Sequence, residues 1–565
     1  MRWHLSQPSL PRGPDQVIDL VLANRGVSDR QSFLGPAHPS SLSPARVGID
    51  DDQLRRAVDR LDQARRRRQK VAVFGDYDVD GICAAAVLWQ TLYRGGWQVM
   101  PFIPHRQRHG YGLTDAALRS VRADHQPDLI VTVDNGIVAL EQVKRLVDQG
   151  IDVIVTDHHL PEERAGRQLL PPATAVVHTT QLCGTTVAWV LAREVARQLL
   201  DESDDQAIND QLDLAGLATI ADQVKLHDAN RSFAFHGIEA LRRTGRPGLT
   251  ALIAQAGIDQ QRISAGQVGF GLAPRINAMG RLDDGLAALR MLCTGDPAQA
   301  NRQAALLDQT NLDRRNLTKE AIDTALAQAD DWQDEHLIVA ASPLFHQGVV
   351  GLVAGRLVEQ FAKPAIVMSV DDKVVKASAR SIPGVDIVEL VRQVRDDLLD
   401  VGGHPMAAGF SLAPAKLEAV TSRLYELARR QISPELLEPA VVIDCRLPPE
   451  LVGLELVGEL ERLEPHGSGN PRPTFLLEGW RLDQFSTVGK ENSHLKLRLS
   501  RGGQRVTGMG WRLARLSGLL TAPGDVPGHP QLDLVVELER NHWNGRTSLQ
   551  LVVRQFRLDR QRRSS

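Results

Sequence analysis

The chain has 565 residues, of which 42% are hydrophobic and 24% are charged; this composition is typical of several folded domains and excludes wholesale disorder. No apolar run approaches the roughly 18 residues of a membrane span, and the first residues lack the apolar segment of a secretory signal. Four widely spaced cysteines form neither a disulfide framework nor a zinc site, so we expect a cytoplasmic protein.

The net charge of −3 combines 66 basic with 69 acidic residues. A sum over the whole chain does not reveal a basic face, so it does not exclude nucleic-acid binding. From residue 480 to the end, 15 Lys and Arg stand against 7 Asp and Glu. The C-terminal segment is therefore basic, and the rest of the chain is acidic.

Residues 1–48 are rich in Pro, Ser and Gly and predict an extended N-terminal arm. Residues 49–296 predict a first domain, in which short apolar runs such as KVAVFGD alternate with helical segments from residue 71. This alternation is typical of βαβ units and a parallel sheet. Residues 297–332 lack internal Gly or Pro and predict a connecting helix about 50 Å long.

Residues 333–431 predict a second α/β domain, and from about residue 474 the pattern changes to β. Five candidate strands are interrupted by an irregular stretch (512–528), which predicts an OB-type barrel within residues 440–565, a common nucleic-acid-binding module. In HLKLRLS the alternate leucines at 495, 497 and 499 are expected inside the barrel. Trp480, Trp511 and Trp543 either stack on bases or fill the barrel core.

Acidic and imidazole side chains follow three predicted strands, and ligands bind at the carboxyl ends of the strands in such sheets. Carboxylates suit Mg²⁺ or Mn²⁺, and imidazole shifts the preference towards Mn²⁺ or Zn²⁺. Each cluster has a simpler interpretation: a calcium loop or solvated turn, a structural His pair, or a surface residue at a helix end. The EF-hand interpretation fails because no Glu stands at the twelfth position of the loop. The clusters are Asp76, Asp78 and Asp80; Asp134; and Asp157, His158 and His159, with Asp222 after a helical run.

The segments GDYDVDG, VDNG, DHH and the Asp after ATIA resemble the four motifs of the DHH phosphoesterase superfamily. Further segments resemble its RecJ family of bacterial single-strand-specific exonucleases, in the expected order over nearly the whole chain except the arm. They are HRQRHGYGL, LAPRINAMGR, HQGVVGLVAGRLVE, KASARS, GGHPMAAGF, PHGSGNPRPTF and NHWNGRTSLQL.

The resemblance implies a parallel-sheet DHH domain, a DHHA1 domain beyond the connecting helix, and a C-terminal OB fold. It implies a processive 5′→3′ exonuclease that hydrolyses single-stranded DNA to mononucleotides in repair and recombination, with Mn²⁺ or Mg²⁺ in a two-metal site. The expected partners are single-stranded DNA, a helicase and a single-strand-binding protein, and no membrane. The alternatives are a DHH phosphodiesterase for small substrates and a non-catalytic scaffold.

Carried over by position, the resemblance implies metal ligands at Asp78, Asp80, Asp134, His158 and Asp222. Asp134 is expected to bridge both ions, Asp76 and His159 stand beside the ligands, and His159 either donates a proton or contacts phosphate. The implied substrate-binding residues are Arg106, Arg275, Asn277, Ser378, Arg380, Gly402, Gly403 and His404.

The sequence departs from the family pattern at four positions, and none of them is a metal ligand. Cys83 replaces Ser or Thr, Met279 replaces a smaller residue, Phe345 replaces Trp, and His466 replaces Phe. These changes concern packing and rate, so the expected reaction class does not change.

Overall fold

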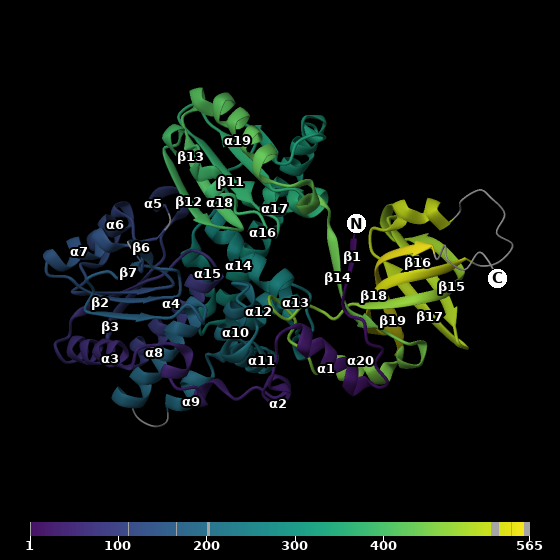
Figure 1. Cartoon of the computed structure of the whole chain (residues 1–565). Helices are drawn as coiled ribbons and strands as arrows, with labels where there is room; N and C mark the ends of the chain where they lie inside the picture. Colours follow the sequence, from purple (N-terminus) through teal and green to yellow (C-terminus); the bar gives the residue numbers. More distant parts are fainter. Residues whose placement is uncertain are drawn as a thin grey trace. The chain divides into compact units, whose positions relative to one another are not determined.

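The computed structural model describes residues 2–110, 112–164, 166–200, 204–520, 530–543 and 545–558. The chain divides into two compact units, whose elements are labelled in Figure 1. Residues 42–222 and 236–439 form one, called here the α/β unit. Residues 1–41, 223–235 and 440–565 form the other, the C-terminal unit. Within the described ranges, no helix combines the length and the hydropathy that crossing a bilayer requires.

A five-stranded parallel sheet opens the α/β unit, in the order β3-β2-β4-β5-β8. Helices α6 and α7 cover one face, and α3, α4 and α8 lie on the other (Figure 1). Both faces are therefore covered, which explains why the sequence LIVTV of β4 is apolar or β-branched throughout and fully buried. The strands are β2 (Lys70–Phe74), β3 (Gln98–Phe102), β4 (Leu129–Val133), β5 (Asp152–Asp157) and β8 (Ala175–His178), with a hairpin of β6 (Glu162–Arg164) and β7 (Arg167–Leu169). The helices are α3 (Asp51–Arg66), α4 (Val79–Arg94), α5 (Arg106–His109), α6 (Asp115–His125), α7 (Leu140–Asp148) and α8 (Gly184–Leu199).

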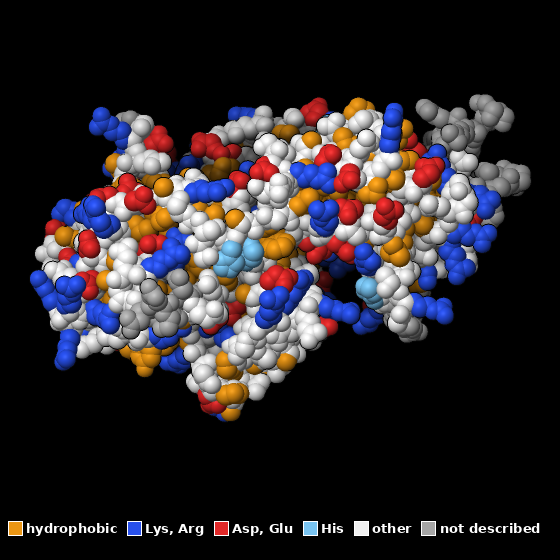
Figure 2. Space-filling view, turned by 90° about the horizontal axis from the view of Figure 1, so that it is seen from below, with side chains coloured by type: hydrophobic (Ala, Val, Ile, Leu, Met, Phe, Trp, Pro, Cys, Tyr) orange, Lys and Arg blue, Asp and Glu red, His pale blue; other side chains and the backbone are white. Residues whose placement is uncertain are grey.

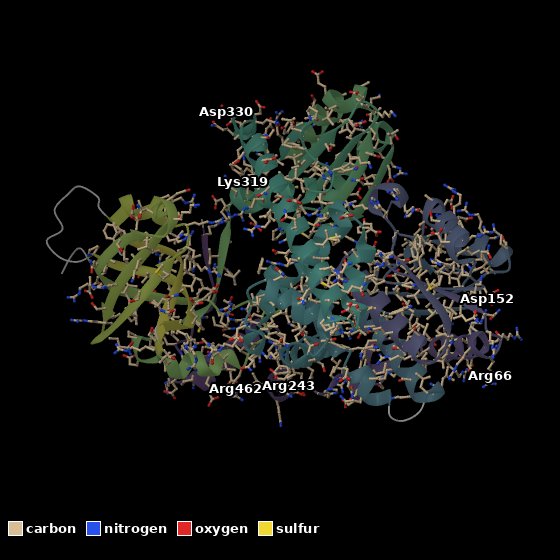
Figure 3. All side chains as sticks on the ribbon, turned by 180° about the vertical axis from the view of Figure 1, so that it is seen from behind. Arg66, Asp152, Arg243, Lys319, Asp330 and Arg462 are labelled. Carbon is tan, nitrogen blue, oxygen red and sulfur yellow. The ribbon has the colours of Figure 1, made fainter. Side chains whose placement is uncertain are left out.

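A helical region follows the parallel sheet and ends in the long helix α16. This helix has 30 residues and buries Ala300, Ala304 and Leu307 against its neighbours, so it is part of the core as well as a connection. It ends at Leu326, six residues earlier than expected, and the chain continues as a 3₁₀ turn to Trp332, whose buried indole donates to the carbonyl of Val339 at 3.0 Å. Figure 3 labels Lys319 near the end of α16 and Asp330 in that turn. The helices are α9 (Asp204–Asn209), α10 (Leu212–Ala221), α11 (Asp228–Arg243), α12 (Pro247–Gln255), α13 (Ala265–Gln267), a π-helix (Val268–Leu272), α14 (Ala273–Leu282), α15 (Gly285–Cys293) and α16 (Pro297–Leu326).

A second five-stranded sheet completes the α/β unit, in the order β12-β13-β11-β10-β9. Strands β9 and β10 are parallel, and the other neighbouring pairs are antiparallel. The strands are β9 (Ile338–Ser342), β10 (Ala365–Val370), β11 (Val375–Arg380), β12 (Asp400–His404) and β13 (Ala407–Leu412), and the helices are α17 (Val350–Phe361), α18 (Ile387–Arg392) and α19 (Leu417–Gln431).

The C-terminal unit contains a closed five-stranded barrel, because β15 pairs with both β16 and β18. Leu495, Leu497 and Leu499 are buried in it, as their alternation predicted. The α/β and OB-type fold class is thereby confirmed. The strands are β14 (Ala440–Arg446), β15 (Phe475–Val488), β16 (His494–Arg501), β17 (Gln504–Gly510), β18 (Gln531–Trp543) and β19 (Arg546–Leu558). Helix α20 (Leu454–Glu461) lies between β14 and β15 in the sequence.

The expectation of an extended N-terminal arm is wrong. The segment forms β1 (Arg2–Gln7), α1 (Pro14–Asn24) and α2 (Arg30–Leu34). Strand β1 pairs in parallel with β14, with Leu5 opposite Ile443. Helix α1 buries Val17 and Val21 in the same hydrophobic core as the barrel strands. The Pro-rich flanks concealed this amphipathic helix.

The three barrel tryptophans differ in their environment. Trp480 is fully buried, so the core interpretation holds for it, whereas Trp511 is half exposed. The side chain of Trp543 and residues 521–528 of the expected irregular stretch lie outside the described residues. On the face shown in Figure 2, basic and acidic side chains are interspersed rather than separated.

Candidate metal centre

The predicted acidic clusters meet at one edge of the parallel sheet. Strand β2 leads into the loop that carries Asp76 and Asp78, β4 leads into Asp134, and β5 ends at Asp157, next to His158. These strands are adjacent and parallel, so their carboxyl ends share an edge.

Two other elements add carboxylates to this edge. Asp80 lies in the first turn of α4, and Asp222 directly follows α10. Nε2 of His158 lies 3.1 Å from Oδ1 of Asp134, 3.7 Å from Oδ2 of Asp80 and 3.9 Å from Oδ2 of Asp222. The structure therefore brings together every residue that the resemblance implied as a metal ligand.

Asp134 occupies a central place in this cluster. Sets of side chains whose potential ligand atoms all lie within 4.8 Å of one another include Asp134 with Asp76 and Asp78, and Asp134 with His158 and His159. A third set joins Asp80, His158 and Asp222. Membership in two sets is what a carboxylate that bridges two ions requires.

Several carboxyl groups of the cluster have raised pKa values. Burial, together with the charge of Asp78, raises the pKa of Asp76 to about 8, and burial with the charge of Asp80 raises that of Asp222 to about 9. The pKa of Asp134 is also well above its ordinary value, first because of burial and then because of Asp80. Divalent ions offset such crowding of carboxylates.

Two further features test whether metal ions fit. Oδ1 of Asp134 is buried and has no hydrogen-bond partner in the described part of the chain, which leaves its lone pairs free for an ion. Burial lowers the pKa of His158, which favours the neutral imidazole that metal binding needs. The donor set of carboxylates and imidazole thus fits Mn²⁺ or Mg²⁺.

Helix α8 fixes the position of Asp80. The backbone amides of Gly184 and Thr185 donate to its two carboxylate oxygens at 2.7 and 2.8 Å. A Cβ atom at residue 184 would lie 2.4 Å from Oδ1 of Asp134, so only glycine fits there. Sequence reasoning missed this support, because no motif connects residues about 100 positions apart.

Asp157, the first residue of the DHH motif, was placed in the third cluster from the sequence but was given no role of its own. Its Oδ1 lies 2.7 Å from Nδ1 of His159, and its Oδ2 accepts from the amide of Ile137 at 2.9 Å. Burial lowers the pKa of His159, but the hydrogen bond and charge of Asp157 outweigh this and raise it to about 9. The carboxylate of Asp157 therefore favours the protonated imidazole of His159.

Arginines gather beside the metal ligands. The guanidinium of Arg106 lies over the ring of Tyr77 at 5.5 Å, and Nη1 of Arg380 donates to Oγ of Ser378 at 3.1 Å. Burial, followed by the charges of Arg106, Arg314 and Arg380, lowers the pKa of Arg281 to about 10. Such mutually repelling cations suit a phosphate group. Sequence reasoning missed Arg281, although it ends the LAPRINAMGR segment.

The remaining predicted substrate residues have other surroundings. Oδ1 of Asn277 accepts from the amide of Val79 at 3.1 Å and so supports the metal-binding loop. Nε of Arg275 pairs with Asp308 at 2.8 Å, and its Nη1 donates to the carbonyl of Gly271. A substrate contact by Arg275 stays a prediction.

The glycine-rich element lies on the edge strand β12. Gly402, Gly403 and His404 are exposed, and Gly403 has a φ of 141°, with a virtual Cβ 2.3 Å from the carbonyl oxygen of Ala407. Within the described ranges, no hydrogen bond or ion pair joins these three residues to the metal cluster. Their contact with substrate also stays a prediction.

Comparison with known proteins assigns a family profile to each folded region. Residues 70–220 match the DHH family N-terminal domain, residues 334–430 match the DHHA1 domain, and residues 443–555 match the RecJ OB domain.

The similarity to individual proteins extends over the whole chain. The single-stranded-DNA-specific exonuclease RecJ of Bacillus subtilis is 36% identical over 577 residues, covering 98% of this chain and 70% of that protein. That of Escherichia coli is 32% identical and covers 96% of each chain. The crystal structure of Thermus thermophilus RecJ in complex with Mn²⁺ superimposes with a TM-score of 0.81 at 31% identity, covering 98% of this chain and 79% of that one.

Proposed function

The chain belongs to the RecJ family of single-stranded-DNA-specific exonucleases, and we propose that it removes nucleotides one at a time from the 5′ end of single-stranded DNA. The observation that carries this proposal is the convergence of carboxylates and imidazole from three parallel strands, with an arginine cluster beside them. Related crystal structures hold Mn²⁺ or Mg²⁺, and the donor set here suits both ions.

We assign the metal ligands to Asp78, Asp80, Asp134, His158 and Asp222, with Asp134 as the bridge. A pair of bound divalent ions supplies a water of lowered pKa and neutralises charge at the phosphate. Asp76 and Asp78 belong to the Asp134 side of the cluster, whereas Asp80 and Asp222 belong to the His158 side.

His159 acts on the substrate rather than on the ions in this assignment. Its Nδ1 lies 2.7 Å from Oδ1 of Asp157, and we assign its Nε2 to the phosphate or to a proton transfer. As a cation with a raised pKa, His159 can donate a proton to the leaving oxygen or neutralise a phosphate oxygen. Both roles need the same protonated ring.

The proposed direction rests on Arg106, Arg281 and Arg380. When the scissile phosphate lies at the metal ligands, the terminal 5′-phosphate lies one nucleotide further along the strand. The charge of Asp78 acts to raise the pKa of Arg281, and the charge of Arg106 acts to lower the pKa of Asp76. The three arginines therefore lie beside the proposed metal ligands. We assign them to the terminal 5′-phosphate, with the hydroxyl of Ser378 as a further contact.

The barrel of the C-terminal unit is proposed to bind the strand outside the active site. Its sequence from residue 480 onwards carries an excess of basic residues, and Trp511 presents a half-exposed ring beside His494, with centroids 5.0 Å apart. Stacking of bases on such rings is independent of sequence. A helicase or single-strand-binding protein that supplies the strand stays a prediction.

The proposal is tested with purified protein, Mn²⁺ or Mg²⁺, and long single strands labelled at the 5′ or the 3′ end. We expect labelled mononucleotide at once from 5′-labelled strands and only late from 3′-labelled strands, with no cleavage of blunt duplex. Early release from the 3′ label contradicts the direction. Activity confined to dinucleotides indicates a small-substrate phosphodiesterase, and binding without cleavage indicates a scaffold.

A further inference from the structure

A buried ion pair lies at the ends of α4 and α10 that are remote from the metal centre. Nε of Arg246, in the turn between α11 and α12, lies 3.2 Å from Oδ2 of Asp213, in the first turn of α10. The two side chains are 13% and 3% exposed. None of the proposed catalytic or substrate contacts uses this pair.

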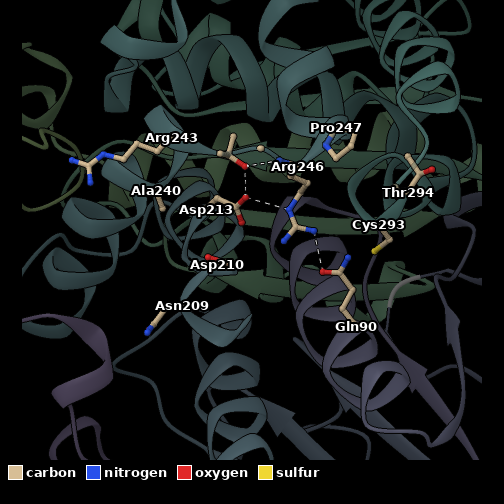
Figure 4. A pocket seen from close by; sticks show the side chains of 13 residues that line it. Gln90, Asn209, Asp210, Asp213, Ala240, Arg243, Arg246, Pro247, Cys293 and Thr294 are labelled. Carbon is tan, nitrogen blue, oxygen red and sulfur yellow. Dashed lines mark hydrogen bonds and ion pairs between the residues drawn. The ribbon is translucent and has the colours of Figure 1, made fainter. Parts of the chain in front are cut away.

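The pair links several helices of the α/β unit (Figure 4). Nη1 of Arg246 donates to Oε1 of Gln90 on α4 and to the carbonyl of Leu292 on α15, both at 3.0 Å. The hydroxyl of Thr244 donates to Oδ2 of Asp213 at 2.7 Å. Gln90, Asp213, Thr244 and Arg246 line a cavity of about 500 Å³. Arg246 thus contacts both α4 and α10 at this end.

The opposite ends of the same two helices carry proposed metal ligands. Asp80 lies ten residues before Gln90 on α4, about 15 Å along the helix, and Asp222 lies nine residues after Asp213, about 14 Å along α10. Helices α4 and α10 pack against each other in antiparallel orientation, since Nε2 of Gln211 also donates to Thr91 at 3.3 Å. One pair of helix ends holds the ion pair, and the other pair of ends reaches the metal centre.

Asp80 and Asp222 differ in what holds them. Two amides of α8 fix the carboxylate of Asp80. Within the described residues, no hydrogen bond fixes the carboxylate of Asp222. Nε2 of His158 lies 3.9 Å from its Oδ2. The position of Asp222 therefore depends on how α10 is seated against α4. Metal–oxygen bonds tolerate only a few tenths of an ångström, so a small slide of α10 matters.

We propose that Arg246 and Asp213 are positioning residues for the metal centre: they fix the register of α10 against α4, so that Asp222 and Asp80 can bind the same ion. The proposal rests on the ligand assignment given above. Outer partners of metal ligands commonly account for ten- to a hundredfold in metal affinity, and we expect an effect at the lower end because this pair acts over a helix length.

The test is a Mn²⁺ titration of the metal-free full-length protein, with free Mn²⁺ followed by electron paramagnetic resonance. Arg246→Gln removes the ion pair with Asp213, whereas Gln90→Ala removes only the hydrogen bond from Arg246 to α4 and leaves the ion pair intact. We expect Mn²⁺ affinity to fall about tenfold in the first and severalfold in the second. Cleavage is expected to recover to near the wild-type kcat at saturating Mn²⁺.

Leu424→Ala is the matched control, because it opens a cavity in the core around α19 and touches neither helix. It is expected to lower Tm without changing Mn²⁺ affinity. Unchanged Mn²⁺ affinity in both Gln90→Ala and Arg246→Gln overturns the proposal, as does an equal loss of affinity in Leu424→Ala. If Arg246→Gln does not fold, the Mn²⁺ affinity of Gln90→Ala alone tests the proposal. Failure of the wild-type protein to bind Mn²⁺ contradicts the ligand assignment instead.

Discussion

Oδ1 of Asp157 lies 2.7 Å from Nδ1 of His159, and this contact both orients the imidazole and raises its pKa. Asp157 itself is buried, and the amides of His158, His159 and Ile137 donate to it. Asp157 thereby holds a carboxylate in a fixed position at Nδ1 of His159.

We expect Asp157→Asn to lower kcat by about a hundredfold, the lower end of what a positioned proton donor contributes. Removing the negative charge lowers the pKa of His159, so the fraction of protonated imidazole falls at lower pH than in the wild type. The alkaline limb of the pH–rate profile should move to lower pH by about one unit, since a charged hydrogen bond is worth about 1.5 kcal/mol or more. A profile of unchanged shape contradicts this role.

Asp134→Asn is expected to lower cleavage by more than about a hundredfold, because a bridging ligand matters more than the outer partners that account for ten- to a hundredfold. Asp134 has a φ of 61°, a conformation that Asn tolerates well, so Tm should change little. Mn²⁺ titration and single-strand cleavage measure the effect. Asp148→Asn, on the exposed end of α7, is the control and should behave as wild type; substantial activity in Asp134→Asn contradicts the ligand assignment.

Asp80→Ala is a less direct test of the same assignment. It also abolishes cleavage if the assignment holds, but it leaves the amides of Gly184 and Thr185 buried without an acceptor. Unsatisfied buried donors cost about 1–3 kcal/mol each, so metal loss and destabilisation would be mixed. Asp134→Asn does not have this complication, because Asn tolerates the backbone conformation at residue 134.

The convergence of three acidic clusters could be predicted from the sequence, because the carboxyl ends of neighbouring parallel strands share an edge. The apolar runs before Asp76, Asp134 and Asp157 were enough to apply that rule. The ligand set itself, with Asp80 on α4 and Asp222 after α10, was implied only by the family resemblance. The support from Gly184 to Asp80 could not be predicted in this way, because it depends on where the start of α8 packs against α4.

The architecture of the C-terminal unit was predicted only in part. The alternation in HLKLRLS indicated a barrel strand, and β16 has the expected inside and outside positions. The pairing of Leu5 with Ile443 joins residues more than 400 positions apart, and no local pattern indicates such a contact. For this reason a fragment of residues 440–565 would lack β1 and α1, and binding experiments require the full chain.

Arg380→Ala is expected to reduce the preference for 5′-phosphorylated over 5′-hydroxyl strands by about tenfold or more, as a charged hydrogen bond of about 1.5–3 kcal/mol implies. The measurement is kcat/KM for the two substrates at saturating Mn²⁺. Arg356→Ala, which removes an exposed ion pair with Glu359 on α17, is the matched control and should leave the ratio unchanged. If wild type shows no preference for the phosphate, the arginine cluster does not bind it.

Trp511→Ala is expected to weaken binding of long single strands by about tenfold, since stacking of one base contributes about 1–3 kcal/mol. Turnover of dinucleotides is expected to be unchanged. Binding is measured by fluorescence anisotropy of the catalytically inactive Asp134→Asn chain at several salt concentrations. The exposed residue Val442 on β14 provides a control as Val442→Ala, and equal loss in both variants contradicts a stacking role.

His466 makes the C-terminal unit sensitive to acid. Burial, then the charges of Arg25 and Arg472, lowers its pKa to about 3, and its buried Nδ1 has no hydrogen-bond partner in the described part of the chain. In the unfolded chain the pKa is about 6.5. Between these values the unfolded state binds more protons, so the free energy of unfolding is unaffected above about pH 6.5 and falls as the pH drops towards 3.

At pH 5 this loss amounts to about 2 kcal/mol. His466→Phe and His466→Gln both remove the titrating group, and both should abolish this part of the difference in unfolding free energy between pH 7.5 and pH 5. His466→Phe should in addition stabilise the protein at neutral pH, because it buries no unpaired polar atom. Urea unfolding of the three metal-free proteins at both pH values measures the effect. An equal acid-induced loss in wild type and both variants would show that His466 is protonated in the folded state.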